Sequence, residues 1–423
     1  MSQAATDEIK GPQLFGHPAG LFTLFFAEMW ERFSYYGMRA LLLFYMIKGF
    51  LGLNDTEAYG IYGAYTALVY MTPYFGGMLA DRLLGRRKAV VLGGLLMAAG
   101  HLLMTFENKL AFFGALALLI AGNGFFKPNI STIVGELYPK ASDKKDTGFT
   151  IFYMGINLGA AMSPIVCGYV GETYGWHYGF GLATAGMLVG VAVFVAPTRL
   201  TQLLIGGGAI ATSIAMPFWQ DTLLQLIVRL FMGVMLTTAA IVAVMALNRG
   251  PLPDEAGAPP DPAALKKKVG GILPLEWAVY LATLVGVVIF AVVVQQNFIA
   301  KLVLYTTGGF FLVYIIYEMV ARCTKIERER LIVVLVLFFF NMLFWAFFEQ
   351  AGSSLNNWTD RNIDRVLEDR TAAQSDVGST ITFRVPPTTE DPELLKLPIL
   401  SQEQLGQKNG DAAMNEVIEK AIR

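Results

Sequence analysis

Four ionisable side chains lie inside the first long apolar stretch of this sequence. Glu28, Glu31, Arg32 and Arg39 all belong to the run AEMWERFSYYGMRALLLFYM. At about 100° per residue, an α-helix would place these four residues and Tyr36 on one side. Charged groups are costly inside a membrane helix and usually serve a function. The stripe could be a structural network that locks helices together, but its length favours the wall of a cavity that handles protons and a charged solute.

The chemistry of these groups suits that second interpretation. A carboxyl group here can change protonation near neutral pH, because burial and a neighbouring arginine act on it in opposite directions. Arginine keeps its charge and can hold a carboxylate through two parallel hydrogen bonds. Lys127 is a further cation, and Pro128 directly after it can kink a helix that lines a cavity. Glu349 lies near the end of the last apolar block, where it could also merely mark the water boundary.

The composition shows what must position these residues. The chain has 423 residues, of which 55% are hydrophobic and 15% charged, whereas a soluble domain carries about 25% charged residues. A net charge of −1 gives no electrostatic basis for binding nucleic acid. Blocks of about 20 apolar residues are long enough to cross a bilayer as helices. The sequence therefore predicts an all-α polytopic membrane protein with about eleven spans, near residues 20–47, 59–80, 89–106, 110–135, 148–171, 179–197, 203–218, 223–247, 275–294, 302–320 and 331–351.

The loops predict an orientation. Lys and Arg gather in alternate loops, at 82–88, 140–145, 249–268 and 322–330. Since positive charge collects on the cytoplasmic side, the N-terminus is expected to be cytoplasmic. The polar residues 353–423 would then lie outside, and an odd number of spans predicts a chain that stops partway through a larger protein.

Other kinds of site have little support in the sequence. No His, Cys and carboxylate spacing suggests a metal site, and no glycine-rich phosphate loop follows a strand. No nucleophile–base pair lies at a plausible depth for an intramembrane enzyme. Tyr62, Tyr65, Tyr70 and Tyr74 follow helical spacing, which core packing explains for most of them. We expect neither an enzyme nor a bound cofactor.

Several stretches resemble known transporters. The loop GGMLADRLLGRRK resembles the signature between the second and third helices of major facilitator superfamily transporters. The run EMWERFSYYG resembles the ExxER motif of the proton-coupled oligopeptide transporter (POT, or PTR) family. The stretches FYMGINLGAAMSPIVCGYV and FWAFFEQAGSSLNNW agree with that family. The loop residues that match are Gly77, Asp81, Arg82, Gly85, Arg86 and Arg87.

The resemblance implies a fold and a site. The fold would be two six-helix bundles that work by alternating access, driven by protons and without another cofactor. The peptide site would contain Arg32 and Lys127 near the peptide carboxylate, with Tyr36, Tyr70 and Asn157 adding hydrogen bonds. Proton coupling would involve Glu28, Glu31, Arg32 and Lys127, together with an ion pair between Arg39 and Glu349.

The resemblance also divides the chain. A cytoplasmic segment would span 1–19 and the N-terminal bundle 20–198. Additional helices would occupy 199–320, with a cytoplasmic linker at 248–274. The first helix of the C-terminal bundle would span 321–352, and 353–423 would be extracytoplasmic. Two features depart from the family: four additional apolar blocks where bacterial members usually have one pair, and no counterpart of the last five helices.

We therefore expect a multi-pass, monomeric protein of the cytoplasmic membrane that imports di- and tripeptides together with protons. Two alternatives stay open. One is a major facilitator transporter of another solute, such as nitrate or a drug-like anion. The other is a membrane peptide sensor that does not transport.

Overall fold

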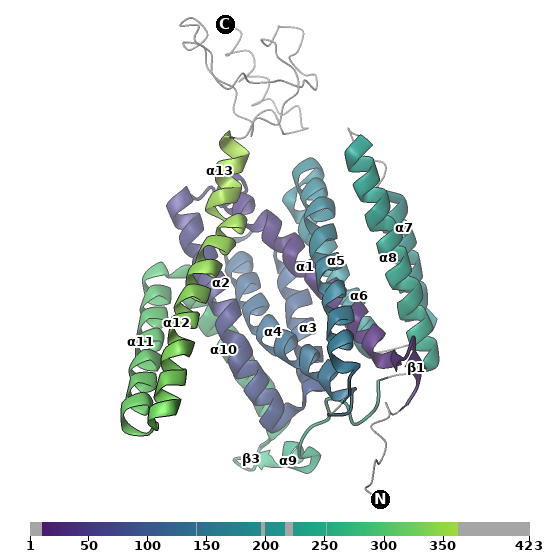
Figure 1. Cartoon of the computed structure of the whole chain (residues 1–423). Coiled ribbons are helices and arrows are strands. Elements are labelled where there is room, and N and C mark those ends of the chain that lie inside the picture. Colours follow the sequence, from purple (N-terminus) through teal and green to yellow (C-terminus); the bar gives the residue numbers. More distant parts are fainter. Residues whose placement is uncertain (1–10, 141, 196–198, 216–222, 251, 363–423) are drawn as a thin grey trace, which may run out of the picture. The chain divides into compact units, whose positions relative to one another are not determined.

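The computed structural model describes residues 11–140, 142–195, 199–215, 223–250 and 252–362, and these residues are almost entirely helical (Figure 1). The chain divides into two compact units. The first unit comprises Met1–Gly171 and Trp176–Tyr305, and the second comprises Glu172–Gly175 and Thr306–Arg423. Nearly all of the predicted site residues belong to the first unit.

The first six apolar blocks each contain one long helix. Helix α1 is the most deeply buried of them and packs against α5, α6 and α8. Helix α4 packs against α2 and α3. The bounds of these helices are α1 (Ala19–Lys48), α2 (Asp55–Leu79), α3 (Arg86–Leu103), α4 (Lys109–Glu136), α5 (Lys145–Tyr174) and α6 (Trp176–Val195).

Five further long helices follow α6. Helices α7 and α8 pair with each other, and α8 also contacts α1. Helix α10 packs on α4, after a linker that contains the short helix α9 and a two-stranded hairpin. The bounds are α7 (Arg199–Ala215), α8 (Leu223–Arg249), α9 (Pro262–Lys266), β3 (Lys268–Val269), β4 (Leu273–Pro274), α10 (Leu275–Gln295), α11 (Asn297–Ala321), α12 (Lys325–Phe348) and the short α13 (Ser354–Asn362).

Helices thus occupy all eleven predicted spans, although fewer meet a strict criterion of length and apolarity. Seven of the described helices do so: α4, α5, α6, α8, α10, α11 and α12. Helix α1 is not among them because Glu28, Glu31, Arg32 and Arg39 interrupt its apolar sequence. Of the predicted terminal segments, residues 1–10 and 363–423 lie outside the described residues.

Glycine pairs bring the helices of the first unit into backbone contact. A Cβ atom on Gly76 of α2 would collide with the carbonyl oxygen of Gly124 on α4. A Cβ on Gly93 of α3 would lie 2.6 Å from the carbonyl oxygen of Gly122, also on α4. Membrane helices commonly use small residues in this way, since lipid gives them little hydrophobic reason to associate. Helix α4, which carries Lys127, is therefore fixed on two sides.

Replacing Gly76 with alanine is expected to destabilise the protein by about 1–3 kcal/mol, because the added methyl group forces α2 and α4 apart. Thermal unfolding of the purified protein in detergent would measure the loss. Gly63→Ala on the same helix is the matched control, since a Cβ there meets nothing within 4 Å. Equal unfolding temperatures for the two variants would contradict the expected collision.

A small hairpin precedes α1 and positions a histidine. Strands β1 (Gln13–Leu14) and β2 (His17–Pro18) pair in an antiparallel manner. Nδ1 of His17 lies 2.8 Å from the hydroxyl of Tyr138, just beyond the end of α4. Burial raises the pKa of Tyr138 to about 12, so its hydroxyl stays protonated beside the imidazole. Burial, and secondarily the charge of Lys144, lower the pKa of His17 below its usual 6.5.

This lowered pKa predicts a pH dependence of stability. The folded protein keeps His17 neutral, whereas the unfolded chain takes up a proton near pH 6.5. The stabilising contribution is thus complete above that pH and is lost as the pH falls toward the lower folded-state pKa. We expect His17→Gln to flatten the decrease in unfolding temperature between pH 7 and pH 5. Parallel curves for the parent and the variant would refute this role for His17.

Candidate functional site

A cluster of three charged side chains is buried on α1. Nε of Arg32 lies 3.0 Å from Oε1 of Glu28, and the same nitrogen pairs with Oε2 of Glu31. The exposed fractions are 2% for Glu28, 0% for Glu31 and 3% for Arg32. The helical spacing of four residues explains the first contact, because positions i and i+4 lie one turn apart on the same face. One guanidinium therefore serves two carboxyl groups in the protein interior.

Helix α5 closes over this cluster. A Cβ on Gly159 would meet the carbonyl oxygen of Met29 and lie 3.1 Å from Cβ of Arg32. One turn earlier, a Cβ on Gly155 would lie 2.9 Å from the carbonyl oxygen of Phe25. Only glycine, which has no side chain, lets the two helix backbones approach so closely. The predicted cavity wall is therefore sealed at its charged core in this conformation, while Tyr36 and Arg39, further along the stripe, are half-buried.

The buried cluster keeps unused hydrogen-bonding capacity. Among the described residues, Oε2 of Glu28, Oε1 of Glu31 and Nη2 of Arg32 have no hydrogen-bond partner. Buried polar atoms almost always have one. The cluster can therefore take up a proton without first breaking the ion pair between Arg32 and Glu28.

Lys127 faces the same cluster from α4. It interacts electrostatically with both Glu28 and Glu31. Its ammonium group lies 5.1 Å from the centre of the Tyr70 ring on α2, which is within the range of a cation–π contact. Tyr70 is 46% exposed, so Lys127 lies between the buried cluster and a residue that solvent can reach. Three helices thus bring together residues that are about 100 positions apart in the sequence.

Helix α4 continues through Pro128, although a proline inside a helix usually kinks or ends it. Nearby polar side chains bond to the backbone around it. The amide of Asn129 donates to the carbonyl oxygen of Phe125 at 2.7 Å, and the hydroxyl of Ser131 donates to the carbonyl oxygen of Pro128 at 3.1 Å. Because proline has no N–H, the helical bond that is lost is the one to the carbonyl oxygen of Gly124, and these side-chain bonds add polar contacts to the carbonyl oxygens on either side of the break.

Arg39 is held on the α2 side of the stripe. Its Nε donates to the hydroxyl of Tyr62 at 2.7 Å. The guanidinium carbon also lies 6.0 Å from the ring centres of both Tyr36 and Tyr62. These contacts fix the direction of the guanidinium. They also give Tyr62, one of the four tyrosines at helical spacing that the sequence explained mostly by core packing, a role in positioning Arg39.

Removing the hydroxyl of Tyr62 tests this positioning role. We expect Tyr62→Phe to cost about 1.5–3 kcal/mol in unfolding free energy, as for other hydrogen bonds from charged groups. Thermal unfolding would measure that loss. Tyr74→Phe is the matched control on the same helix, because Tyr74 is 67% exposed. If both variants unfold like the parent, the bond between Arg39 and Tyr62 contributes nothing.

Two other predicted site residues are Asn157 and Glu349. Asn157 is exposed on α5, and its amide donates to the carbonyl oxygen of Tyr153 at 3.2 Å. Glu349 begins a short 3₁₀ turn, Glu349–Gly352, directly after α12. It belongs to the second unit, so its pairing with Arg39 stays a prediction.

The loop between α2 and α3 forms its own ion-pair network. A π-helical turn, Ala80–Leu84, ends at Gly85, which adopts a φ of 77°. Nη2 of Arg86 lies 2.7 Å from Oδ1 of Asp81, and Nη1 of Arg86 pairs with Glu136 at the end of α4. The other matched loop residues are Gly77, which lies against Pro128, the exposed Arg82, and Arg87, which bonds to the linker after α8.

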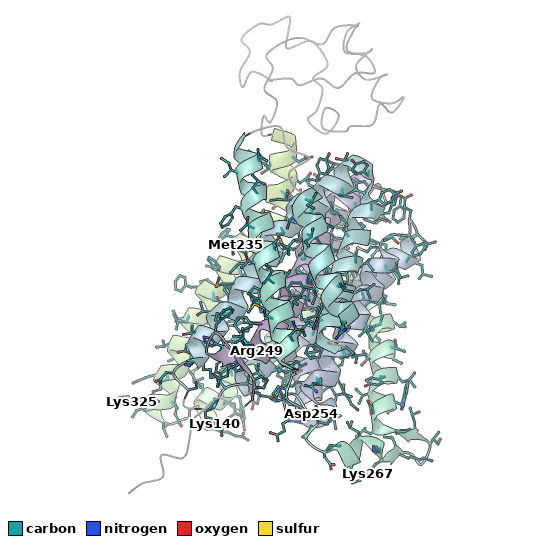
Figure 2. All side chains as sticks on the ribbon, turned by 90° about the vertical axis from the view of Figure 1, so that its right-hand side faces the viewer. Lys140, Met235, Arg249, Asp254, Lys267 and Lys325 are labelled. Atoms are coloured by element: carbon teal, nitrogen blue, oxygen red, sulfur yellow. The ribbon has the colours of Figure 1, made fainter. Side chains whose placement is uncertain are left out.

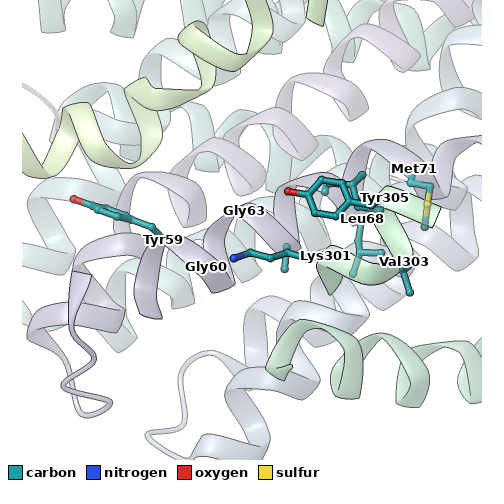
Figure 3. A pocket seen from close by; sticks show the side chains of 11 residues that line it. Tyr59, Gly60, Gly63, Leu68, Met71, Lys301, Val303 and Tyr305 are labelled. Atoms are coloured by element: carbon teal, nitrogen blue, oxygen red, sulfur yellow. The ribbon is translucent and has the colours of Figure 1, made fainter. Parts of the chain in front are cut away.

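A separate cavity of about 280 Å³ lies between α2 and the start of α11 (Figure 3). Gly60 and Gly63 leave space on the α2 side, while Lys301 and Tyr305 line the other side. None of the predicted site residues lines this cavity. It lacks convergent charged groups, so the buried cluster and Lys127 are the better candidate site.

Glycines and acceptors on neighbouring helices were not predicted as part of the site. Gly155 and Gly159 have a recognisable signal, since small residues four positions apart predict a close helix contact. Glu136 had none, because its partners Arg86 and Gly257 are distant in the sequence. Such contacts can be recognised only in the three-dimensional structure.

The sequence profile of the POT family matches residues 87–377. The chain belongs to the POT family. This match spans more than half of the chain and includes Lys127, Asn157 and Glu349. The ExxER run at residues 28–32 precedes the matched region, so the assignment of its residues rests on that motif alone.

Curated relatives and solved structures agree with the family. The chain is 35% identical over 354 residues to the uncharacterized transporter YclF of Bacillus subtilis, covering 82% of this chain and 61% of the relative. It is 31% identical to the peptide transporter YePEPT of Yersinia enterocolitica, covering 86% of this chain and 64% of that relative. A crystal structure of a peptide transporter POT with sulfate shares 34% identity and a TM-score of 0.59, covering 86% of this chain and 64% of that one. A crystal structure of a POT family transporter in complex with 5-aminolevulinic acid shares 31% identity and a TM-score of 0.62, covering 85% of this chain and 65% of that one. This POT chain thus spans less than two thirds of the length of these relatives.

Proposed function

We propose that the protein is a proton-coupled symporter that imports di- and tripeptides by alternating access. Membership of the POT family supports this, as do relatives that are named as peptide transporters in Yersinia enterocolitica and Lactococcus lactis. The observation that carries the proposal is the buried Glu28–Arg32–Glu31 cluster beside Lys127. Groups of this kind inside a membrane helix mark pathways for ions and substrates.

The site suits a peptide zwitterion at its carboxylate end. Arg32 and Lys127 supply positive charge, and a guanidinium can bind a carboxylate through two parallel hydrogen bonds. Tyr36, Tyr70 and Asn157 would add hydrogen bonds to the peptide. A cavity that recognises the ends of a peptide needs few contacts with its side chains, which fits transport of many di- and tripeptides.

Protonation would change which partners the cations have. While Glu28 and Glu31 are ionised, they hold Arg32 and attract Lys127. A proton on one carboxyl group weakens that hold, and a peptide carboxylate can then take its place. Binding of peptide and of proton would each favour the other, which is the coupling a symporter requires. Arg39 and Glu349 would form a second proton-sensitive pair between the two bundles.

The arrangement in the membrane is also proposed. The basic loops support a cytoplasmic N-terminus in the cytoplasmic membrane. Residues 20–198 would form the N-terminal bundle, and 321–352 the first helix of the C-terminal bundle. Residues 199–320 would add two helical pairs to that plan, with 248–274 as a cytoplasmic linker. We expect a monomer, and we infer no enzymatic reaction from the site.

Uptake of a radiolabelled dipeptide into proteoliposomes tests the function. An inward proton gradient should drive accumulation, and a protonophore should abolish it. Accumulation that ignores the gradient would favour a transporter of another solute, and nitrate or a drug-like anion should then compete for uptake. Peptide binding without counterflow would instead indicate a sensor. Arg82→Gln is a useful control variant, since that arginine is exposed and outside the cluster.

A further inference from the structure

The linker after α8 crosses the ends of three helices that position the site. Its residues 252–258 lie at the start of α1, the start of α3 and the end of α4. Leu252 is buried against Gly20, where a Cβ would lie 2.7 Å from the leucine side chain. Nη2 of Arg87 donates to the carbonyl oxygens of Leu252 at 3.2 Å and Pro253 at 2.9 Å. Figure 2 shows Asp254 of this segment at the same end of the bundle as Arg249.

One residue of this segment bonds two helices at once. The backbone N–H of Arg87, in the first turn of α3, donates to the carbonyl oxygen of Gly257 at 2.9 Å. The N–H of Gly257 donates to Oε2 of Glu136, the last residue of α4, at 2.8 Å. The first bond satisfies an N–H that has no partner within α3. The second uses the carboxylate that also pairs with Arg86.

The fit depends on two glycines. Gly257 adopts a φ of 72°, and a Cβ there would lie 2.9 Å from the backbone nitrogen of Arg87. Gly85 has a φ of 77°, and a Cβ there would collide with the backbone of Pro259. Side chains at these positions would hold the linker away from α3. The segment is therefore docked by shape as well as by hydrogen bonds.

The two hydrogen bonds of Gly257 depend on the distance between the start of α3 and the end of α4. Gly257 can keep both bonds only while the start of α3 and the end of α4 stay where they are. Glu136 lies nine residues after Lys127 on the same helix, which is about 14 Å along its axis. A shift of α4 that starts at Lys127 reaches Glu136 through a continuous helix. A shift that lengthens either hydrogen bond of Gly257 would release the segment from that helix.

We propose that residues 252–258 form a latch that fastens the start of α3 to the end of α4 in this conformation and opens when α4 moves during transport. The opening step rests on the proposed transport function, whereas the fastening does not. In the proposed orientation the latch is cytoplasmic. It would therefore restrain the N-terminal bundle on the side where the substrate is released.

Hydrogen exchange measured by mass spectrometry tests the fastening without any transport assay. Glu136→Gln removes the charged acceptor, and Gly257→Ala introduces the collision with Arg87. Both should speed amide exchange in residues 252–258 by about tenfold or more. Asp254→Asn is the matched control, because that carboxylate is exposed and its separation of 3.9 Å from Arg87 is too long for a hydrogen bond. Unchanged exchange in both test variants would overturn the latch.

Hydrogen exchange during turnover tests the opening. Proteoliposomes that take up a dipeptide under an inward proton gradient should exchange the amides of residues 252–258 at least about tenfold faster than the same proteoliposomes at rest. Unchanged exchange during measured uptake would show that the latch need not open. If the parent protein does not transport, the proposed function fails, and the exchange of the test variants at rest still decides the fastening.

Discussion

Replacing Arg32 with alanine is expected to abolish peptide binding and to destabilise the protein by about 3–5 kcal/mol. The guanidinium is the shared partner of Glu28 and Glu31, and all three groups are at most 3% exposed. Removing it leaves two carboxyl groups without their cation in the interior, and breaking a buried ion pair from one side has this cost. Isothermal titration with a dipeptide would measure binding, and thermal unfolding would measure stability.

Two further variants separate charge from geometry. Arg32→Lys keeps the positive charge but lacks the planar, two-pronged donor, so it should retain most of the stability and lose most of the affinity. Arg82→Ala removes an exposed arginine and should change neither quantity. Unaltered peptide affinity in Arg32→Ala would remove Arg32 from the binding site, whatever happened to stability.

Replacing Glu349 with glutamine is expected to abolish proton-driven accumulation and leave peptide exchange largely intact. Glutamine resembles the protonated carboxyl group, so the proposed pair with Arg39 would be permanently weakened. Tyr62 already holds the guanidinium of Arg39 on the α2 side through a 2.7 Å bond, which limits where a partner can approach. Accumulation against a gradient and counterflow without one would be measured in the same proteoliposomes.

The control for that variant lies on α12, the helix that precedes Glu349. Glu329 of α12 is exposed and near the opposite end from Glu349. Glu329→Gln should therefore accumulate peptide like the parent. Persistent accumulation in Glu349→Gln would show that this carboxyl group does not couple protons to transport.

The sequence predicted the helices well because membrane helices are specified locally. Blocks of about 20 apolar residues locate the spans, and charges such as Lys127 inside those blocks stand out without any knowledge of neighbours. The family resemblance then grouped Arg32 with Lys127, and the structure places both beside Glu28 and Glu31. The spacing of α1 alone explains the contact between Glu28 and Arg32.

The remaining features depend on contacts between distant segments. The sequence predicted that the charged stripe faces a cavity, but Gly159 allows α5 to cover its core in this conformation. The hydrogen bond between Arg39 and Tyr62 and the two bonds of Gly257 were not predictable. The sequence does not show which hydroxyl or backbone groups of distant segments meet. A linker rich in proline and glycine signalled only a loop, and its docking on Arg87 and Glu136 required the arrangement of three helices.

The two native cysteines differ in a way that favours spectroscopy. Cys167 of α5 is buried, and its sulfur is the neighbour that a Cβ on Gly37 would meet at 2.6 Å. Cys323 lies in the turn between α11 and α12 and is partly exposed. A maleimide dye should therefore attach at a single position, in the second unit, without any engineering. Fluorescence from that probe could follow movements of the second unit in the unmodified protein while cargo and pH are varied.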